Sequence, residues 1–365
     1  MLGLGLGHSG TLSNYREEDT GLQYRTSASE NFRTSALKNF IVAAEPPASA
    51  SWTLGDHMGA QSIDVTINIH NGQPWGNDLI AYGYDDGSEG FLFSNAGDLI
   101  TMHRLDGSES RGLIVWDLNV KWDLDQGYAG LSAEMLLDMA HFPSNRKPWG
   151  MQWDVNGDLV VLYRRSSGED YQFNGYDLNS GFEISGEGTK MGPDRAQSYG
   201  NLQNDGIGFS IDATAFYVSV GGGNPLPTHD IYRYNVDPSN DFMLGGSGNL
   251  NQTLSPFPDT LLGQGQTMAG IFMYNSGQNL IVTGDNGNVG GIFHGIHRYS
   301  LTTPYDLTTL VHEEWIDFRS TANGGTNYTA TKGDPQQFVW KPDGTKYYWG
   351  GSNNYGGMKI SQVTC

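Results

Sequence analysis

Residues 270–310, GIFMYNSGQNLIVTGDNGNVGGIFHGIHRYSLTTPYDLTTL, decide the fold of this chain. Three short runs in this stretch have the apolar and β-branched alternation of strands, at residues 271–273, 279–283 and 292–301. Turn-forming residues separate them, Asn-Ser-Gly-Gln at 275–278 and a Gly/Asn-rich segment at 285–291. Short alternating runs joined by such turns are typical of antiparallel hairpins.

The same order of features recurs five times along the chain. The copies occupy residues 90–119, 150–179, 206–236, 270–310 and 336–363. Their central turns lie at Gly97, Gly157, Ala213, Gly277 and Gly344, which gives a period of roughly 60 residues. A sheet-forming unit repeated at such a spacing is typical of propeller blades. The sequence therefore predicts an all-β protein, a β-propeller with five blades, and six blades are the alternative.

The third strand of each copy ends on a bulky residue, a small polar residue and an aliphatic residue. The bulky residues are Trp116, Tyr176, Tyr234 and Tyr299, and the fifth copy has a weaker match at Ile360-Ser361. Alternate residues of a strand face the same side, so these side chains are expected to be buried. We expect them to pack between neighbouring blades rather than to form a binding site.

Composition narrows the classes of partner. The chain has 365 residues, enough for one large β domain, and a net charge of −20. Such a charge disfavours nucleic acid and anionic membrane surfaces. No apolar run is long enough for membrane insertion, and the start of the chain lacks the pattern of a secretory signal. The single cysteine, Cys365, cannot form an internal disulfide.

Residues 1–50 differ from the rest and are predicted to form an extended N-terminal arm, while residues 51–365 form the propeller. The arm is nearly neutral, so the propeller carries almost all of the net charge. Its apolar side chains would be wasted on a purely solvated tail, so we expect the arm to dock on a partner. The anchoring candidates are Leu2, Leu4, Leu6, Phe32, Phe40 and Ile41.

Three assignments concern the ends and connections of the blades. Residues 52–54 are predicted to be the N-terminal strand that completes the last blade, which leaves residues 61–69 and 78–84 as an inserted hairpin or a degenerate sixth blade. Residues 133–140 have the composition of a helix but the position of an outer strand, and both remain open. Residues 181–204 are long, polar and Gly-rich and are predicted to be a surface loop.

The sequence holds no recognisable catalytic, cofactor or metal motif. Weak candidates are Asp85 and Asp86, which precede the first inner strand and could bind a cation or act on a sugar at a channel mouth. The simpler explanation is a solvated acidic turn. His294 and His297 are three apart on one strand and so face opposite sides, which is unsuitable for a shared metal. We therefore expect no cofactor, no metal and no catalysis.

Aromatic residues in the connections are the better binding candidates. Trp75, Trp149, Tyr199, Tyr328 and Tyr355 lie in Gly/Asn/Pro-rich segments. Aromatic rings beside Asn and Asp suit the faces of saccharides, because sugar CH groups stack on the ring while polar groups bind the hydroxyls. The alternative, which is at least as well supported, is that these aromatics cover the cores of the blades.

Residues 299–309, YSLTTPYDLTT, and residues 338–348, FVWKPDGTKYY, resemble a propeller repeat that is frequent in structural proteins of tailed bacteriophages. The resemblance extends over residues 90–365, more loosely in the first three copies, and transfers no functional residue. It implies a virion protein, in the tail, fibre or capsid, whose arm binds other virion proteins and whose propeller serves assembly or binds host-surface glycan. It also implies a homo-oligomer within the assembly. The alternative function is a propeller glycan hydrolase or lyase that uses channel carboxylates such as Asp85 and Asp86.

Overall fold

The computed structural model divides the chain into two compact units, Met1–Glu45 and Pro46–Cys365. The residues it describes all belong to the second unit: 63–69, 75, 84–105, 111–137, 146–153, 157–165, 170–177, 189–198, 206–212, 215–221, 230–237, 243–244, 250–254, 267–285, 295–317, 337–352 and 358–365. The anchoring candidates of the arm lie outside them.

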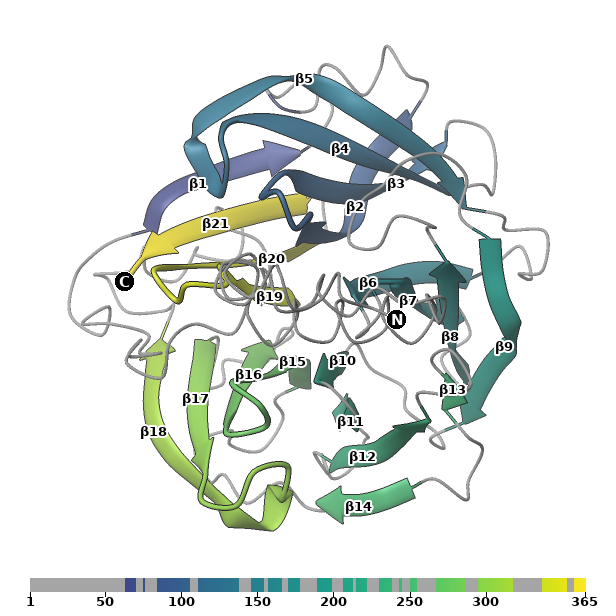
Figure 1. Cartoon of the computed structure of the whole chain (residues 1–365), viewed down its shortest axis with the longest axis vertical. Helices are drawn as coiled ribbons and strands as arrows, with labels where there is room; N and C mark the ends of the chain where they lie inside the picture. Colours follow the sequence, from purple (N-terminus) through teal and green to yellow (C-terminus); the bar gives the residue numbers. More distant parts are fainter. Residues whose placement is uncertain are drawn as a thin grey trace, which may run out of the picture. The chain divides into compact units, whose positions relative to one another are not determined.

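The second unit consists of five antiparallel sheets, the blades of a β-propeller (Figure 1). Blade 1 contains β2 (Tyr84–Phe93), β3 (Leu99–Leu105), β4 (Arg111–Val120) and β5 (Asp123–Leu137). Blade 2 contains β6 (Arg146–Trp153), β7 (Leu159–Arg165), β8 (Asp170–Asp177) and β9 (Thr189–Ser198). In both blades the strands pair in chain order.

Blades 3 and 4 follow the same plan. Blade 3 contains β10 (Gly206–Asp212), β11 (Ala215–Gly221), β12 (Asp230–Asp237) and β14 (Leu250–Leu254), and the short β13 (Met243–Leu244) also pairs with β12. Blade 4 contains β15 (Thr267–Tyr274), β16 (Asn279–Asp285), β17 (Gly295–Leu301) and β18 (Leu310–Asp317), with a short 3-10 helix η6 (Leu307–Thr309) before the last strand.

Blade 5 is built from both ends of the propeller sequence. Its strands are β19 (Gln337–Trp340), β20 (Lys346–Ser352), β21 (Met358–Thr364) and, as the outermost strand, β1 (Ile63–Ile69). The inner strands of neighbouring blades contact one another around the ring, β2 with β6, β6 with β10, β10 with β15, β15 with β19 and β19 with β2. The predicted five-bladed propeller is therefore confirmed.

The closing strand is not the predicted one. β1 pairs with β21 from Ile63 opposite Val363 to Ile69 opposite Met358. Residues 61–69, left unassigned from the sequence, thus contain the strand that closes the ring, whereas residues 52–54 lie outside the described part of the chain. The physical reason is length, because a strand that pairs along all of β21 needs a comparable alternating run and three residues do not provide it.

Side-chain contacts lock the closing blade to blade 1. The backbone N–H of Leu124 donates to the side-chain oxygen of Gln362 at 2.7 Å, in a buried position. Lys346 forms an ion pair with Asp123 at 2.8 Å. Blade 1 therefore touches the closing blade through polar contacts as well as through its apolar core.

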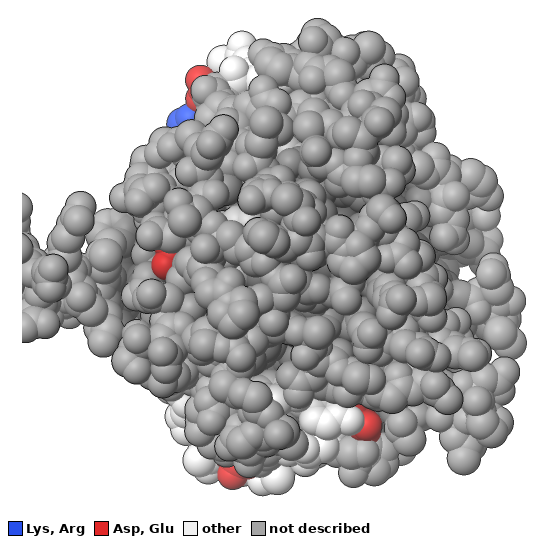
Figure 2. Space-filling model, turned by 90° about the vertical axis from the view of Figure 1, so that its right-hand side faces the viewer, with Lys and Arg blue, Asp and Glu red and all other residues white. Residues whose placement is uncertain are grey.

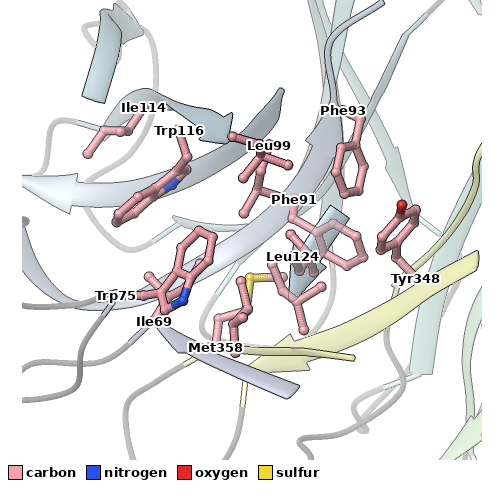
Figure 3. Close-up of a cluster of buried hydrophobic side chains, with 13 residues drawn as sticks. Ile69, Trp75, Phe91, Phe93, Leu99, Ile114, Trp116, Leu124, Tyr348 and Met358 are labelled. Carbon is pink, nitrogen blue, oxygen red and sulfur yellow. The ribbon is translucent and has the colours of Figure 1, made fainter. Parts of the chain in front are cut away.

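The hydrophobic core lies between blades. Figure 3 shows the cluster between blades 1 and 5, where Trp116, Phe91 and Leu99 of blade 1 meet Tyr348 and Met358 of blade 5. Similar clusters join blades 1 and 2, blades 3 and 4, and blades 4 and 5. The third-strand aromatics are buried as predicted, at Trp116, Tyr176, Tyr234 and Tyr299.

The structure decides one open assignment and corrects two others. Residues 133–137 belong to β5, so the strand alternative holds there. Strand β9 occupies residues 189–198, inside the segment predicted to be a loop, and pairs with β8. In blade 5 the register places Val363 opposite Tyr347, as Tyr299 lies opposite Leu280 in blade 4. Val363, rather than Ile360, is therefore the fifth counterpart of the third-strand aromatics.

The antiparallel order gives the propeller two distinct faces. At the first, here called the hairpin face, the first strand of a blade turns into the second, as at residues 94–98, 275–278 and 341–345. At the opposite face, here called the loop face, the second strand leads to the third and one blade leads to the next. The longest connection between successive strands, residues 318–336, joins β18 to β19 there.

Candidate functional site

One polar side chain lies at the centre of the ring. Gln337 of β19 is buried. Its oxygen accepts from the backbone N–H of Phe91 at 3.0 Å, and its nitrogen donates to the carbonyl oxygens of Phe91 and of Met151, the latter at 2.7 Å. Blades 2 and 5 are not neighbours, so a side chain from β19 reaches β6 only across the space between the inner strands. Gln337 therefore reaches across the centre of the ring at this level.

Glycines make room for this side chain. In the paired register, the counterparts of Gln337 in blades 1 to 4 are Gly90, Gly150, Gly208 and Gly270. A Cβ added to Gly90 would lie 3.4 Å from the Gln337 oxygen and 3.4 Å from the Gly150 Cα. The inner strands of blades 1 and 2 therefore approach closely at Gly90 and Gly150 because they lack a side chain there, and Gln337 satisfies the backbone groups of Phe91 and Met151 beside them.

The signal for this arrangement was present in the sequence. From this position the inner strands read GFLF, GMQW, GFSI and GIFM in blades 1 to 4, but QFVW in blade 5. A glutamine in place of glycine matches no catalytic or binding motif, so only a comparison of the five copies at this position reveals it.

Asp85 and Asp86 lie within β2 rather than in a loop before it. β2 is irregular there, because its pairing with β3 shifts register between Tyr84 and Ser88 and again between Ser88 and Gly90. The two residues come before Gly90 in β2 and therefore lie nearer the loop face than Gln337 does. The positions of their side chains lie outside what the structure describes.

Trp75 is the aromatic candidate whose surroundings the structure describes. It is 9% exposed, and its ring lies 4.5 Å from that of Tyr128 and 5.4 Å from that of Trp116, measured between centroids. Trp75 therefore covers the core of a blade, which is the second of the two predictions made for these aromatics (Figure 3). The backbone of Trp149 lies in β6, near the start of an inner strand at the loop face. Tyr199, Tyr328 and Tyr355 lie outside the described residues.

Chain connectivity nevertheless relates these candidates to one face. Tyr199 follows the end of β9, Tyr328 lies between β18 and β19, and Tyr355 lies between β20 and β21. The strand ends from which these three connections depart are all at the loop face.

Described charges do not gather into a site. Within the described residues, no group of three or more His, Cys, Asp or Glu side chains could hold a metal ion. In Figure 2 the described acidic side chains of that view lie at separate points, and a basic side chain adjoins an acidic one at the upper left. No helix in the described segments has the length and apolar character needed to cross a bilayer.

Two buried histidines belong to the blade cores. In blade 1, Trp116 Nε1 donates to the Thr101 hydroxyl at 2.7 Å, and that hydroxyl lies 2.6 Å from His103 Nε2, to which it can donate. In blade 4, His297 Nδ1 lies 3.1 Å from His312 Nε2. Burial lowers the pKa of His103 to about 3, and burial together with the charge of His312 lowers that of His297 to about 3.

These two histidines make the fold sensitive to acid. Because their pKa in the folded protein lies below the unfolded value of 6.5, the stability they contribute is complete above pH 6.5 and is lost as the pH falls toward 3. In this range each histidine can lower the free energy of unfolding by up to about 1.4 kcal/mol for every pH unit of acidification. We expect the free energy of unfolding, measured with urea between pH 7 and pH 4, to fall less steeply with decreasing pH for His103→Gln than for the unmodified chain. Equal slopes would contradict the neutral, buried state of His103.

Comparisons with known proteins find similar solved structures at low identity, but they assign the chain to no family. No protein-family model matches the chain, and no curated protein matches it. Similar solved structures include a luciferin-regenerating enzyme, at 12% identity and a TM-score of 0.44 over 82% of this chain and 95% of that one. A glucose dehydrogenase matches at 11% identity and a TM-score of 0.38, over 78% of this chain and 97% of that one. An oligogalacturonate lyase in complex with manganese matches at 11% identity and a TM-score of 0.32, over 75% and 76%.

Proposed function

We propose that this chain is a structural component of a tailed-bacteriophage particle, in the tail, fibre or capsid, which is held by its N-terminal arm and presents the loop face of its propeller. The observation that supports this is the separation of the two faces. The chain enters β1 at Ile63, beside Val363 and the hairpin face. The connections that hold Tyr199, Tyr328 and Tyr355 depart from the opposite, loop face.

The architecture suits binding without turnover. Each blade is covered by its neighbours, and Gln337 ties three of the five inner strands together at the centre. Such a ring holds the strand ends in fixed positions while the connections between them are free to vary in sequence. In this proposal the arm attaches the chain to the particle, and the loop face contacts other virion proteins or host-surface glycan.

The direct test is quantitative peptide mass spectrometry of purified virus particles, scaled to the major capsid protein. We expect peptides of this chain in the particles. A copy number in the hundreds would indicate a capsid protein, and about a dozen copies would indicate a tail, neck or fibre component. Absence from the particles would overturn the proposal, and cleavage of a polysaccharide by the purified chain would then favour the glycan-active alternative.

The role of the arm has its own test. A chain without residues 1–50 is expected to keep the unfolding midpoint of the propeller but to be lost from assembled particles. The matched control is Val311→Ala in the full-length chain, which changes an exposed apolar residue of β18 and should leave incorporation unchanged. Normal incorporation of the truncated chain would refute anchoring by the arm.

A further inference from the structure

In two blades an aromatic residue with a positive φ packs over the glycine of the first hairpin. In blade 1, Trp122 has a φ of 60° and its N–H donates to the carbonyl of Gly97 at 2.9 Å. In blade 4, Tyr305 has a φ of 65° and its N–H donates to the carbonyl of Gly277 at 2.9 Å. In both cases the aromatic ring lies where a Cβ on the glycine would be.

The residues that form this cover share a sequence pattern. The third strand is followed by Trp122-Asp123-Leu124 in blade 1 and by Tyr305-Asp306-Leu307 in blade 4. Leu124 and Leu307 are both buried, in the clusters that join blades 1 and 5 and blades 3 and 4. An aromatic residue, one polar residue and a leucine therefore cover the turn and fill the core below it, at the start of the outermost strand in blade 1 and just before that strand in blade 4.

Blade 5 has the same hairpin glycine, and the residue after its third strand makes the same hydrogen bond to the hairpin as in blade 4. Gly344 has a φ of 70° and is buried. The N–H of Cys365 donates to the carbonyl of Thr345 at 2.9 Å, as that of Leu301 donates to Gln278 at 2.8 Å in blade 4. The outermost strand of blade 5 is β1, so the segment that precedes it in the chain is the one before Ile63.

That preceding segment contains the pattern. Residues 52–54 read Trp-Thr-Leu, an aromatic residue, one polar residue and a leucine.

The number of residues between the aromatic and the outermost strand is also sufficient. In blade 4, Tyr305 comes seven residues before His312, which pairs with Tyr299. In blade 1, Trp122 comes nine residues before Leu131, which pairs with Trp116. Trp52 comes eleven residues before Ile63, which pairs with Val363, so the chain is long enough to reach Gly344.

We propose that Trp52 is the cover of the fifth hairpin, with its ring over Gly344, its N–H bonded to the Gly344 carbonyl and Leu54 in the core below. Residues 52–54 then belong to blade 5 as the segment before its outermost strand, and the arm ends just before them. This inference concerns the fold of the propeller and stands whether or not the chain is a virion protein.

The test compares Trp52→Ala with Phe40→Ala, a matched aromatic deletion in the arm. We expect Trp52→Ala to lower the unfolding midpoint by roughly 3–6 °C and Phe40→Ala to leave it unchanged. Trp52→Tyr should restore most of the loss, because Tyr305 performs this role in blade 4. Equal midpoints for Trp52→Ala and the unmodified chain would overturn the proposal.

A second measurement identifies the contact itself. Ring currents from an indole over a glycine move its α-proton signals upfield in NMR spectra. We expect the Gly344 α-protons to be upfield in the unmodified chain and in Phe40→Ala, and at ordinary glycine positions in Trp52→Ala. Upfield signals that persist in Trp52→Ala would mean that another residue, or a second copy of the chain, covers Gly344, and would overturn the assignment.

Discussion

Replacing Gln337 with leucine is expected to lower the free energy of unfolding by about 3–6 kcal/mol. Leucine has a similar size but no polar atoms, so the Phe91 N–H and the carbonyls of Phe91 and Met151 would lose the partner they have in the buried channel. Each buried backbone group left unpaired costs roughly 1–3 kcal/mol. Urea unfolding followed by far-UV circular dichroism measures the loss.

Two other variants sharpen this experiment. Gln126→Leu makes the same replacement at an exposed position of β5 and should change the stability by less than about 0.5 kcal/mol. Gln337→Gly would leave room for water to bond to the freed groups and should therefore cost less than Gln337→Leu. A loss of under about 1 kcal/mol for Gln337→Leu would show that the channel side chain contributes little.

The second large effect is expected at a hairpin glycine. Gly97→Ala should cost about 3–5 kcal/mol, because alanine is strained at a φ of 91° and its Cβ would overlap the Trp122 ring. The Trp122 ring stacks on Phe93 with centroids 4.7 Å apart, and the Trp122 backbone carbonyl accepts from the Tyr348 hydroxyl at 2.5 Å. The clash cannot be relieved without disturbing the contact between blades 1 and 5.

The same chain offers a matched control for this substitution. A Cβ added to Gly130 of β5 would meet nothing within 4 Å. Gly130→Ala should therefore leave the stability unchanged or raise it slightly, since alanine restricts the unfolded chain. Both variants can be compared by their urea midpoints. Similar midpoints for the two would contradict the role assigned to Trp122.

The repeating pattern made the fold predictable, and its exceptions were the difficult part. Each alternating run needs a partner strand, so a turn between two such runs indicates a hairpin, and five such turns indicated five blades. The identity of the closing strand depended on pairing between residues almost 300 apart, such as Thr66 with Ser361, which no local pattern reveals. β9 was missed because its sequence, TKMGPDRAQS, has little of the β-branched and aromatic character of strands.

The candidate site was less predictable than the fold. Trp75 has the sequence context of an exposed loop aromatic, yet tertiary contacts with Trp116 and Tyr128 bury it. Gln337 is unremarkable in sequence except by comparison with the glycine of the other copies. Its role depends on the width of the channel, which is a property of the assembled ring and not of any one blade.

The pairing of β1 with β21 sets the order in which the protein can be completed on the ribosome. β1 emerges early in synthesis, but its partner begins only at Met358, so β1 must wait unpaired while four blades are made. An unpaired alternating strand is a site for association with other chains. Synthesis speed and chaperone access should therefore limit the yield of folded protein, and removal of β21 should leave a ring that folds in part but cannot close.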